Sequence, residues 1–128
     1  MSVEVNLTAN EWDIMKIIWE NQPCTLRTIC DEANKDHDWT RHAVISFLKK
    51  MEAKGAVSVD DSESVKIYSA LFAEDEAIRA ELGSTLTRVF DNSPVKMVSY
   101  LAKTGSISDE QIAQMIAILK DGEDKDGK

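Results

Sequence analysis

Residues 40–69, TRHAVISFLKKMEAKGAVSVDDSESVKIYS, are the most informative about the fold, because their hydrophobic period changes from that of a helix to that of a strand. Residues 40–54 place apolar side chains at i, i+3, i+4 and i+7, the spacing of one buried helical face: Val44, Phe47, Leu48 and Met51. Gly55 then ends this helix as a C-cap glycine. Apolar and polar residues alternate from Val57 to Asp60, and again in residues 65–69, with loop-forming residues 60–64 between the two runs. This pattern predicts a two-stranded β-hairpin.

Two helical patterns come before this stretch. Thr8 is a suitable N-cap and Glu11 completes a capping box, and the helix that follows carries one apolar stripe: Trp12, Met15, Ile18 and Trp19. Thr25 begins a second, short helix with its own inner face: Leu26, Ile29, Cys30 and Ala33. A polar connection, residues 34–38, leads to the third helix. Three helices followed by a hairpin is the element order of a winged helix-turn-helix domain.

The apolar spacing in residues 73–120 predicts three more helices, which are separated near Phe90 and at Gly105. These helices are too few to build a core from one chain, so we expect a second copy to cover their apolar positions: Ile78, Leu82, Leu86, Val89, Val98, Leu101, Ile112, Met115, Ile116 and Leu119. The sequence therefore predicts a mainly α protein with a small β-hairpin. We expect a winged-helix domain in residues 1–72, a helical dimerisation domain in 73–120 and a disordered acidic tail in 121–128.

The composition narrows the class of protein. Fifteen Lys and Arg stand against 23 Asp and Glu, and the net charge of −8 excludes a broadly polybasic coat but not a nucleic-acid binder with one basic face. No apolar run approaches the ~18 residues of a membrane span, and residues 1–6 do not resemble a signal peptide. Two cysteines make no disulfide framework. We expect a cytoplasmic protein that does not insert into membranes.

Metal and catalytic sites are not predicted. Cys24 and Cys30 are six residues apart without a second pair of ligands, and His37 and His42 fall on different helical faces. The run Asp36-His37-Asp38 could supply acid–base groups, but no nucleophile or glycine-rich motif accompanies it, and a solvated linker is the better interpretation. The sequence therefore predicts no enzyme and no cofactor.

The outer face of residues 40–54 is the main functional signal. Arg41, Lys49, Lys50 and Lys54 against Glu52 give 4 − 1 = +3 within a chain of −8. Cations for phosphates and short polar side chains for base edges suit a DNA major groove, although a solvated helix face would also carry lysines. The predicted DNA-binding residues are Thr40, Arg41, His42, Ile45, Ser46, Lys49 and Lys50 of this helix, with Lys66 of the hairpin.

Several motifs resemble the penicillinase-repressor family of winged-helix transcriptional regulators. They are LTANEWDIMKIIW in residues 7–19, then Trp39-Thr40, Val44, Phe47-Leu48, Met51, Lys54-Gly55 and Ile67-Tyr68-Ser69. The resemblance covers residues 5–120. It implies a homodimeric repressor that binds double-stranded DNA at a palindromic operator through the helix at 40–54 and dimerises through the helices after residue 72. Antibiotic-responsive members of the family have an upstream sensor, and whether this chain has one is left open by the sequence.

The chain departs from the family pattern at several positions. Ala43 stands where the family usually has Thr, and Ile45 where it often has Arg, which implies a different operator preference. The pair Tyr100-Leu101 lacks the Asn found at the cleavage point of antibiotic-responsive members, and no cysteine follows Cys30, as the copper-responsive branch requires. Regulation by that proteolysis or by copper is therefore not expected.

Other functions compete with a DNA-binding repressor. A winged-helix module that binds protein and has lost DNA affinity is favoured by the overall acidity, by Ala43 and by the acidic hairpin tip: Asp60, Asp61 and Glu63. A small enzyme is the third possibility, and no set of residues supports it.

Overall fold

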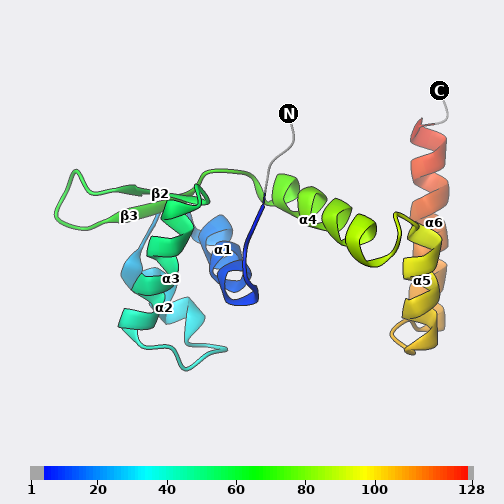
Figure 1. The fold of residues 1–128 in the computed structure, drawn as a ribbon, viewed down its shortest axis with the longest axis horizontal. Coiled ribbons are helices and arrows are strands. Elements are labelled where there is room, and N and C mark those ends of the chain that lie inside the picture. Colours follow the sequence, from blue (N-terminus) through cyan, green and yellow to red (C-terminus); the bar gives the residue numbers. More distant parts are fainter. Residues whose placement is uncertain (1–4, 127–128) are drawn as a thin grey trace. The chain divides into compact units, whose positions relative to one another are not determined.

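The computed structural model describes residues 5–126, and its elements follow the predicted winged-helix order (Figure 1). They are α1 (Ala9–Asn21), β1 (Cys24–Thr25), α2 (Leu26–Ala33), α3 (Arg41–Ala53), β2 (Val57–Asp60), β3 (Ile67–Ala70), α4 (Glu74–Val89), α5 (Pro94–Lys103) and α6 (Asp109–Asp126). The chain forms two compact units that divide within α4, after Leu82. This division comes later than residue 72, and Ala77 in the first turns of α4 is fully buried.

Threonine side chains cap the first three helices. Thr8 Oγ1 accepts a hydrogen bond from Glu11 N at 3.2 Å, and Glu11 Oε1 accepts one from Thr8 N at 2.9 Å, which is the predicted capping box. Thr25 caps α2 through Thr28 N at 3.2 Å, and Thr40 caps α3 through Ala43 N at 3.1 Å. The start of α3 is therefore fixed at its N-cap.

The core of the first unit lies between α1, α2, α3 and the sheet. The predicted stripe of α3 is confirmed, because Val44, Leu48 and Met51 are buried and Phe47 packs partly buried against them. Their partners in the core include Ile14, Met15, Ile18, Ile29 and Val57. The opposite face of α3 is left outside this core.

The sheet differs from the predicted hairpin in two ways. It has three strands in the order β1-β3-β2, because the two-residue β1 pairs with β3 through Cys24 opposite Tyr68. Within the second predicted run, Val65 lies outside the strand and is 54% exposed, whereas Tyr68 is buried. Alternation alone pointed Ile67 toward the core, but the aromatic ring of Tyr68 takes the inward position.

The second unit contains the rest of α4 together with α5 and α6. Ser93 caps α5 through Lys96 N at 3.1 Å, and Ser108 with Gln111 forms a second capping box at α6. The disordered tail expected from residue 121 is wrong as far as Asp126, because α6 continues to that residue. Gly122 does not adopt the positive φ by which Gly55 and Gly105 end their helices. Residues 127–128 of the predicted tail lie outside the described residues.

No helix in residues 5–126 combines the length and the apolar character needed to cross a bilayer.

Candidate nucleic-acid interface

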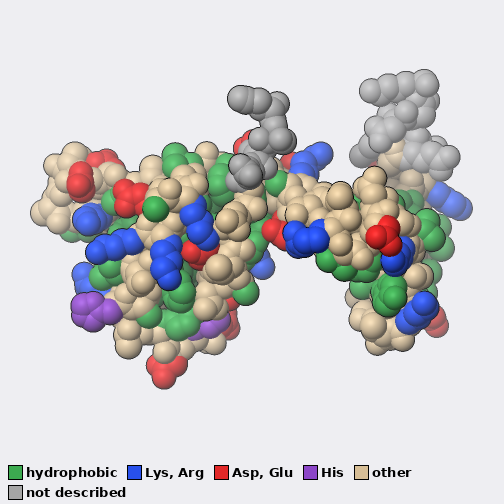
Figure 2. All heavy atoms as spheres, viewed as in Figure 1, with side chains coloured by type: hydrophobic (Ala, Val, Ile, Leu, Met, Phe, Trp, Pro, Cys, Tyr) green, Lys and Arg blue, Asp and Glu red, His purple; other side chains and the backbone are tan. Residues whose placement is uncertain are grey.

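The outward face of α3 gathers most of the predicted DNA-binding residues on one helix. Thr40, Arg41, His42, Ser46, Lys49 and Lys50 are exposed, and Ile45 is half-buried. Lys66 is exposed as well and lies in the hairpin, just before β3. Figure 2 shows Lys and Arg side chains over α3 and the inner part of the hairpin, and Asp and Glu toward the hairpin's outer end.

Arg41 and Lys66 meet a third cation, Arg27, which the sequence analysis missed. All three line a cleft of about 510 Å³ between α2, α3 and the hairpin, together with Thr25, Leu26, Ser64, Val65 and Tyr68. Arg27 lies 4.0 Å from Asp31, and both side chains are largely exposed, so this ion pair is weak. Arg27 could have been noticed as a cation in the first turn of α2. Its position beside Arg41 depends on how the two helices pack.

Tyr68 lines this cleft but adds no negative charge to it. Burial raises the pKa of the Tyr68 hydroxyl, so the phenol stays neutral at physiological pH. The three cations of the cleft therefore come from α2, α3 and the hairpin without a buried anion among them. Several cations that line one cleft can bind the negative charge of a phosphate group.

Lys54 does not belong to the basic face in which the sequence counted it. Its Nζ lies 2.5 Å from Glu11 Oε1 and 2.8 Å from the carbonyl oxygen of Asn6, and so contacts the start of α1. The outward charge of α3 is then 3 − 1 = +2, from Arg41, Lys49 and Lys50 against Glu52. Burial alone would raise the pKa of Glu11, but the Lys54 ammonium and the N–H and hydroxyl of Thr8 outweigh it and lower that pKa.

The hairpin tip is acidic, as the sequence predicts. Asp60 Oδ1 accepts a hydrogen bond from Ser62 N at 3.0 Å, and the Ser62 hydroxyl and N–H lower the pKa of Asp60. Asp60 and its neighbours Asp61 and Glu63 are exposed. Phosphate would be repelled there, whereas Lys66 at the base of the same hairpin lies on the basic cleft.

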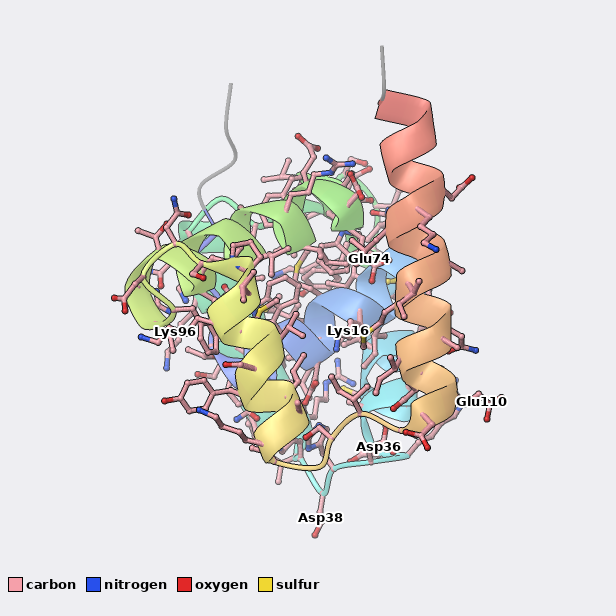
Figure 3. All side chains as sticks on the ribbon, turned by 90° about the vertical axis from the view of Figure 1, so that its right-hand side faces the viewer. Lys16, Asp36, Asp38, Glu74, Lys96 and Glu110 are labelled. Carbon is pink, nitrogen blue, oxygen red and sulfur yellow. The ribbon has the colours of Figure 1, made fainter. Side chains whose placement is uncertain are left out.

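His37 is more than part of a solvated linker, which corrects the expectation for residues 36–38. Its Nε2 lies 2.9 Å from Asp13 Oδ2 of α1, and its ring stacks on Trp39 with centroids 3.8 Å apart. Asp38 does fit the expectation, because it is exposed and points away from the helices (Figure 3).

The cysteines and acidic residues form no reactive site in the described chain. Cys24 is buried and Cys30 half-buried, and burial raises the pKa of both thiols, which disfavours the nucleophilic thiolate. No three His, Cys, Asp or Glu side chains among residues 5–126 come together in a way that could hold a metal ion.

Comparison with known proteins gives consistent matches. The sequence profile described as "Penicillinase repressor" matches residues 7–121. The chain is 23% identical over 111 residues to the penicillinase repressor of Bacillus licheniformis, covering 87% of each chain. It is 22% identical over 118 residues to the penicillinase repressor of Staphylococcus aureus, covering 92% of this chain and 94% of that one.

One solved structure supports the fold. The monomeric form of BlaI from Bacillus licheniformis, in complex with the blaP half-operator, superposes with a TM-score of 0.52 at 21% identity. The match covers 59% of this chain and 93% of that chain.

Proposed function

The chain belongs to the penicillinase repressor family, and on this premise we propose that it is a transcriptional repressor that binds operator DNA as a homodimer. The observation that carries the proposal is the exposed face of α3 next to the cleft lined by Arg27, Arg41 and Lys66. Relatives matched over most of their length are named as repressors, and the BlaI structure holds a half-operator. No enzymatic activity is part of the proposal, and its site of action is the cytoplasm.

The α3 face divides by chemistry into two roles. Cations neutralise phosphates and set the position of the protein, while short polar side chains read base edges. We assign Arg41 and Lys50 to phosphate, and His42, Ser46 and Lys49 to base edges or the nearby backbone. Thr40 and Ile45 contact the groove at the start and flank of the helix. The cleft then receives a phosphate of the strand that borders the groove.

Dimerisation is assigned to the second unit and α4. Large apolar side chains are exposed there, among them Ile78, Leu82, Val89, Val98, Ile112, Ile116 and Leu119. Leu119 is 70% exposed, which is unusual for a leucine on a stripe of this kind. A second copy that covers these positions would present two α3 helices to the two halves of a palindrome.

The role of the cleft is tested by changing the cation that sequence analysis missed. Arg27→Ala should weaken operator binding and flatten the log–log salt dependence by about 0.9 per subunit, or roughly two units per dimer, because one phosphate contact is lost in each. The measurement is fluorescence anisotropy of a labelled operator duplex between low and moderate salt. Lys16→Ala is the matched control, since Lys16 is an exposed cation of α1 that does not line this cleft.

Two results would contradict this assignment. An unchanged salt slope in Arg27→Ala would show that the cleft holds no phosphate. An equal loss in Lys16→Ala would show that the variants act through net charge and not through a local contact.

A protein-binding module without DNA affinity is the second candidate function. The acidic, exposed hairpin tip favours it, since Asp60, Asp61 and Glu63 would suit a basic partner protein. Failure of the full-length chain to bind any duplex at low salt would make this candidate the better account.

A further inference from the structure

We propose that the cleft between α2, α3 and the hairpin also binds a small effector, a phosphate monoester that carries an apolar group, and that the bound effector weakens operator binding. The inference rests on the proposed function, because the effector would occupy the place assigned there to a DNA phosphate. Four features of the cleft support it: its unpaired cations, an apolar wall, a free phenol and its size.

The cations of the cleft are not neutralised by acidic side chains of the chain itself. Arg41 and Lys66 form no ion pair with any residue in 5–126. Arg27 has only the long, exposed contact with Asp31 at 4.0 Å. Because acidic residues outnumber basic ones by 23 to 15, unpaired cations are unexpected in this chain. These three charges are free to bind a dianion such as a phosphate monoester.

One wall of the cleft is apolar, which a backbone phosphate does not require. Leu26 at the start of α2 and Val65 of the hairpin line the cleft together with Tyr68. Val65 is 54% exposed although it is a large apolar side chain. A ligand with an apolar group would cover this wall, and removing apolar surface from water stabilises the complex.

Tyr68 brings to the cleft a hydrogen-bonding group that the protein leaves unused. Its side chain is only 6% exposed, and its hydroxyl makes no hydrogen bond to another described residue. Every fully buried side-chain nitrogen or oxygen in residues 5–126 has a partner, so this hydroxyl must reach solvent, and Tyr68 lines the cleft. Burial raises the pKa of Tyr68, and the phenol therefore stays protonated and can donate to an anion.

The cleft has the size of a small-molecule site. Its volume of about 510 Å³ lies within the range of roughly 300–1,000 Å³ that is typical of ligand pockets. Such pockets combine apolar walls with a few polar groups that fix the orientation of the ligand. Here the cations would hold the phosphate, and Leu26 and Val65 would contact the apolar group.

Effector and operator would compete for the same cations. A phosphate monoester bound to Arg27, Arg41 and Lys66 takes the place of a backbone phosphate and brings negative charge next to α3. Operator affinity should then fall in proportion to the occupancy of the cleft, because the effector binds only the DNA-free form. The cleft would thus let a small molecule relieve repression.

The test uses phenyl phosphate as the probe, with inorganic phosphate and phenol as its two halves. Binding to the full-length chain without DNA is measured by chemical-shift titration of ¹⁵N-labelled protein at pH 8.0 and constant ionic strength. We expect phenyl phosphate to bind about fivefold or more tightly than inorganic phosphate, and phenol not to bind detectably. Equal affinity for the two phosphates would overturn the proposal, since the apolar wall would then contribute nothing.

Two variants locate the probe in the cleft. Val65→Thr keeps the shape of the side chain but replaces a methyl group with a hydroxyl, and should bind phenyl phosphate about threefold more weakly and inorganic phosphate as wild type does. Tyr68→Phe removes only the unpaired hydroxyl and should weaken the binding of both phosphates. Val95→Thr is the matched control, because it makes the same change at a 79% exposed position of α5 outside the cleft. Unchanged phenyl phosphate affinity in Val65→Thr, or an equal loss in Val95→Thr, would place the probe elsewhere and overturn the proposal.

Anisotropy of a labelled operator duplex tests the effect on DNA binding. At ten times the Kd of phenyl phosphate, wild-type operator affinity should be about tenfold lower at constant ionic strength. Inorganic phosphate at the same concentration should have a smaller effect. Unchanged operator affinity with phenyl phosphate bound would contradict the competition.

The two measurements also separate this inference from the proposed function. If wild type binds no duplex but the NMR results hold, the repressor assignment fails and the effector site stands. If wild type binds the operator tightly and phenyl phosphate does not bind, the repressor assignment stands and the effector site fails.

Discussion

Glu11 is a charged side chain that is only 1% exposed, and it links α1 to the end of α3. Its carboxylate contacts Lys54, the C-cap of α3, and the N–H of Thr8. The capping half of this arrangement could be predicted from sequence, since Thr8 and Glu11 are three residues apart. The Lys54 contact could not, because the partners are 43 residues apart and meet only through the packing of α1 on α3.

Glu11→Gln should destabilise the first unit by roughly 1–3 kcal/mol at pH 7, as expected for loss of a charged hydrogen bond by a buried group. The folded-state pKa of Glu11 lies below its ordinary value of 4.5, so its stabilisation is present above that value and is lost as the pH falls through the folded-state pKa. Urea unfolding at pH 7 and at pH 3.5 measures this. The difference between wild type and variant should shrink at pH 3.5.

Asp75→Asn is the control for that experiment, because its ion pair with Arg79 is exposed on both sides. It should unfold like wild type at both pH values. A Glu11→Gln variant that is equally stable at pH 7 would contradict the role given to the buried pair.

Helix α4 carries a glycine in its interior that no neighbour requires. A Cβ at Gly83 would meet no atom within 4 Å, and the φ of Gly83 is not positive. Glycine inside a helix costs about 1 kcal/mol relative to alanine. Gly83→Ala should therefore raise the free energy of unfolding by roughly 0.5–1 kcal/mol, measured by thermal or urea unfolding at one fixed protein concentration.

Gly55→Ala provides the opposite case. Gly55 also has open space around it, but its φ is +80°, a conformation that alanine adopts only with strain. This variant should lose stability by about 1 kcal/mol or more.

For Gly83→Ala, a loss of stability in place of the expected gain would show that another chain packs against α4 at that point.

At the level of elements, periodicity predicted the helices better than the strands. The stripe of α3 is four residues long and repeats over two turns, so its buried face is determined locally. Strand β1 has only two residues and exists because Cys24 and Thr25 pair with β3, a partner far along the chain. A pattern within so short a segment carries no period, and the sheet was therefore predicted with two strands.

The basic surface shows the same division between local and long-range information. The exposed residues of α3 follow from the helix period, whereas the place of Arg27 beside Arg41 and Lys66 needs the packing of three elements. Lys54 is the reverse case. The helix period predicted it on the basic face, but in the structure its ammonium group contacts Asn6 and Glu11 instead.

The whole molecule should depend on a second copy. Ile116 is 48% exposed on α6, and the proposed homodimer would cover its side chain. Ile116→Glu should therefore give a monomer at micromolar concentration, detected by sedimentation, with operator binding at least tenfold weaker because bivalent contact is lost. Gln114→Glu adds the same side chain at an exposed polar position of α6 and should stay dimeric. A monomeric wild type would refute the dimer.

The proposed repressor binds operator DNA through the outward face of α3, and Lys49 lies exposed in the middle of that face. The most direct test is anisotropy of a duplex taken from the DNA that flanks the protein's own gene, measured across a range of salt for wild type and Lys49→Ala. We expect tight wild-type binding at low salt, weaker binding by Lys49→Ala, and a log–log slope reduced by up to about two units per dimer. Wild type without affinity for any duplex at low salt, or Lys49→Ala with unchanged affinity and slope, would contradict it.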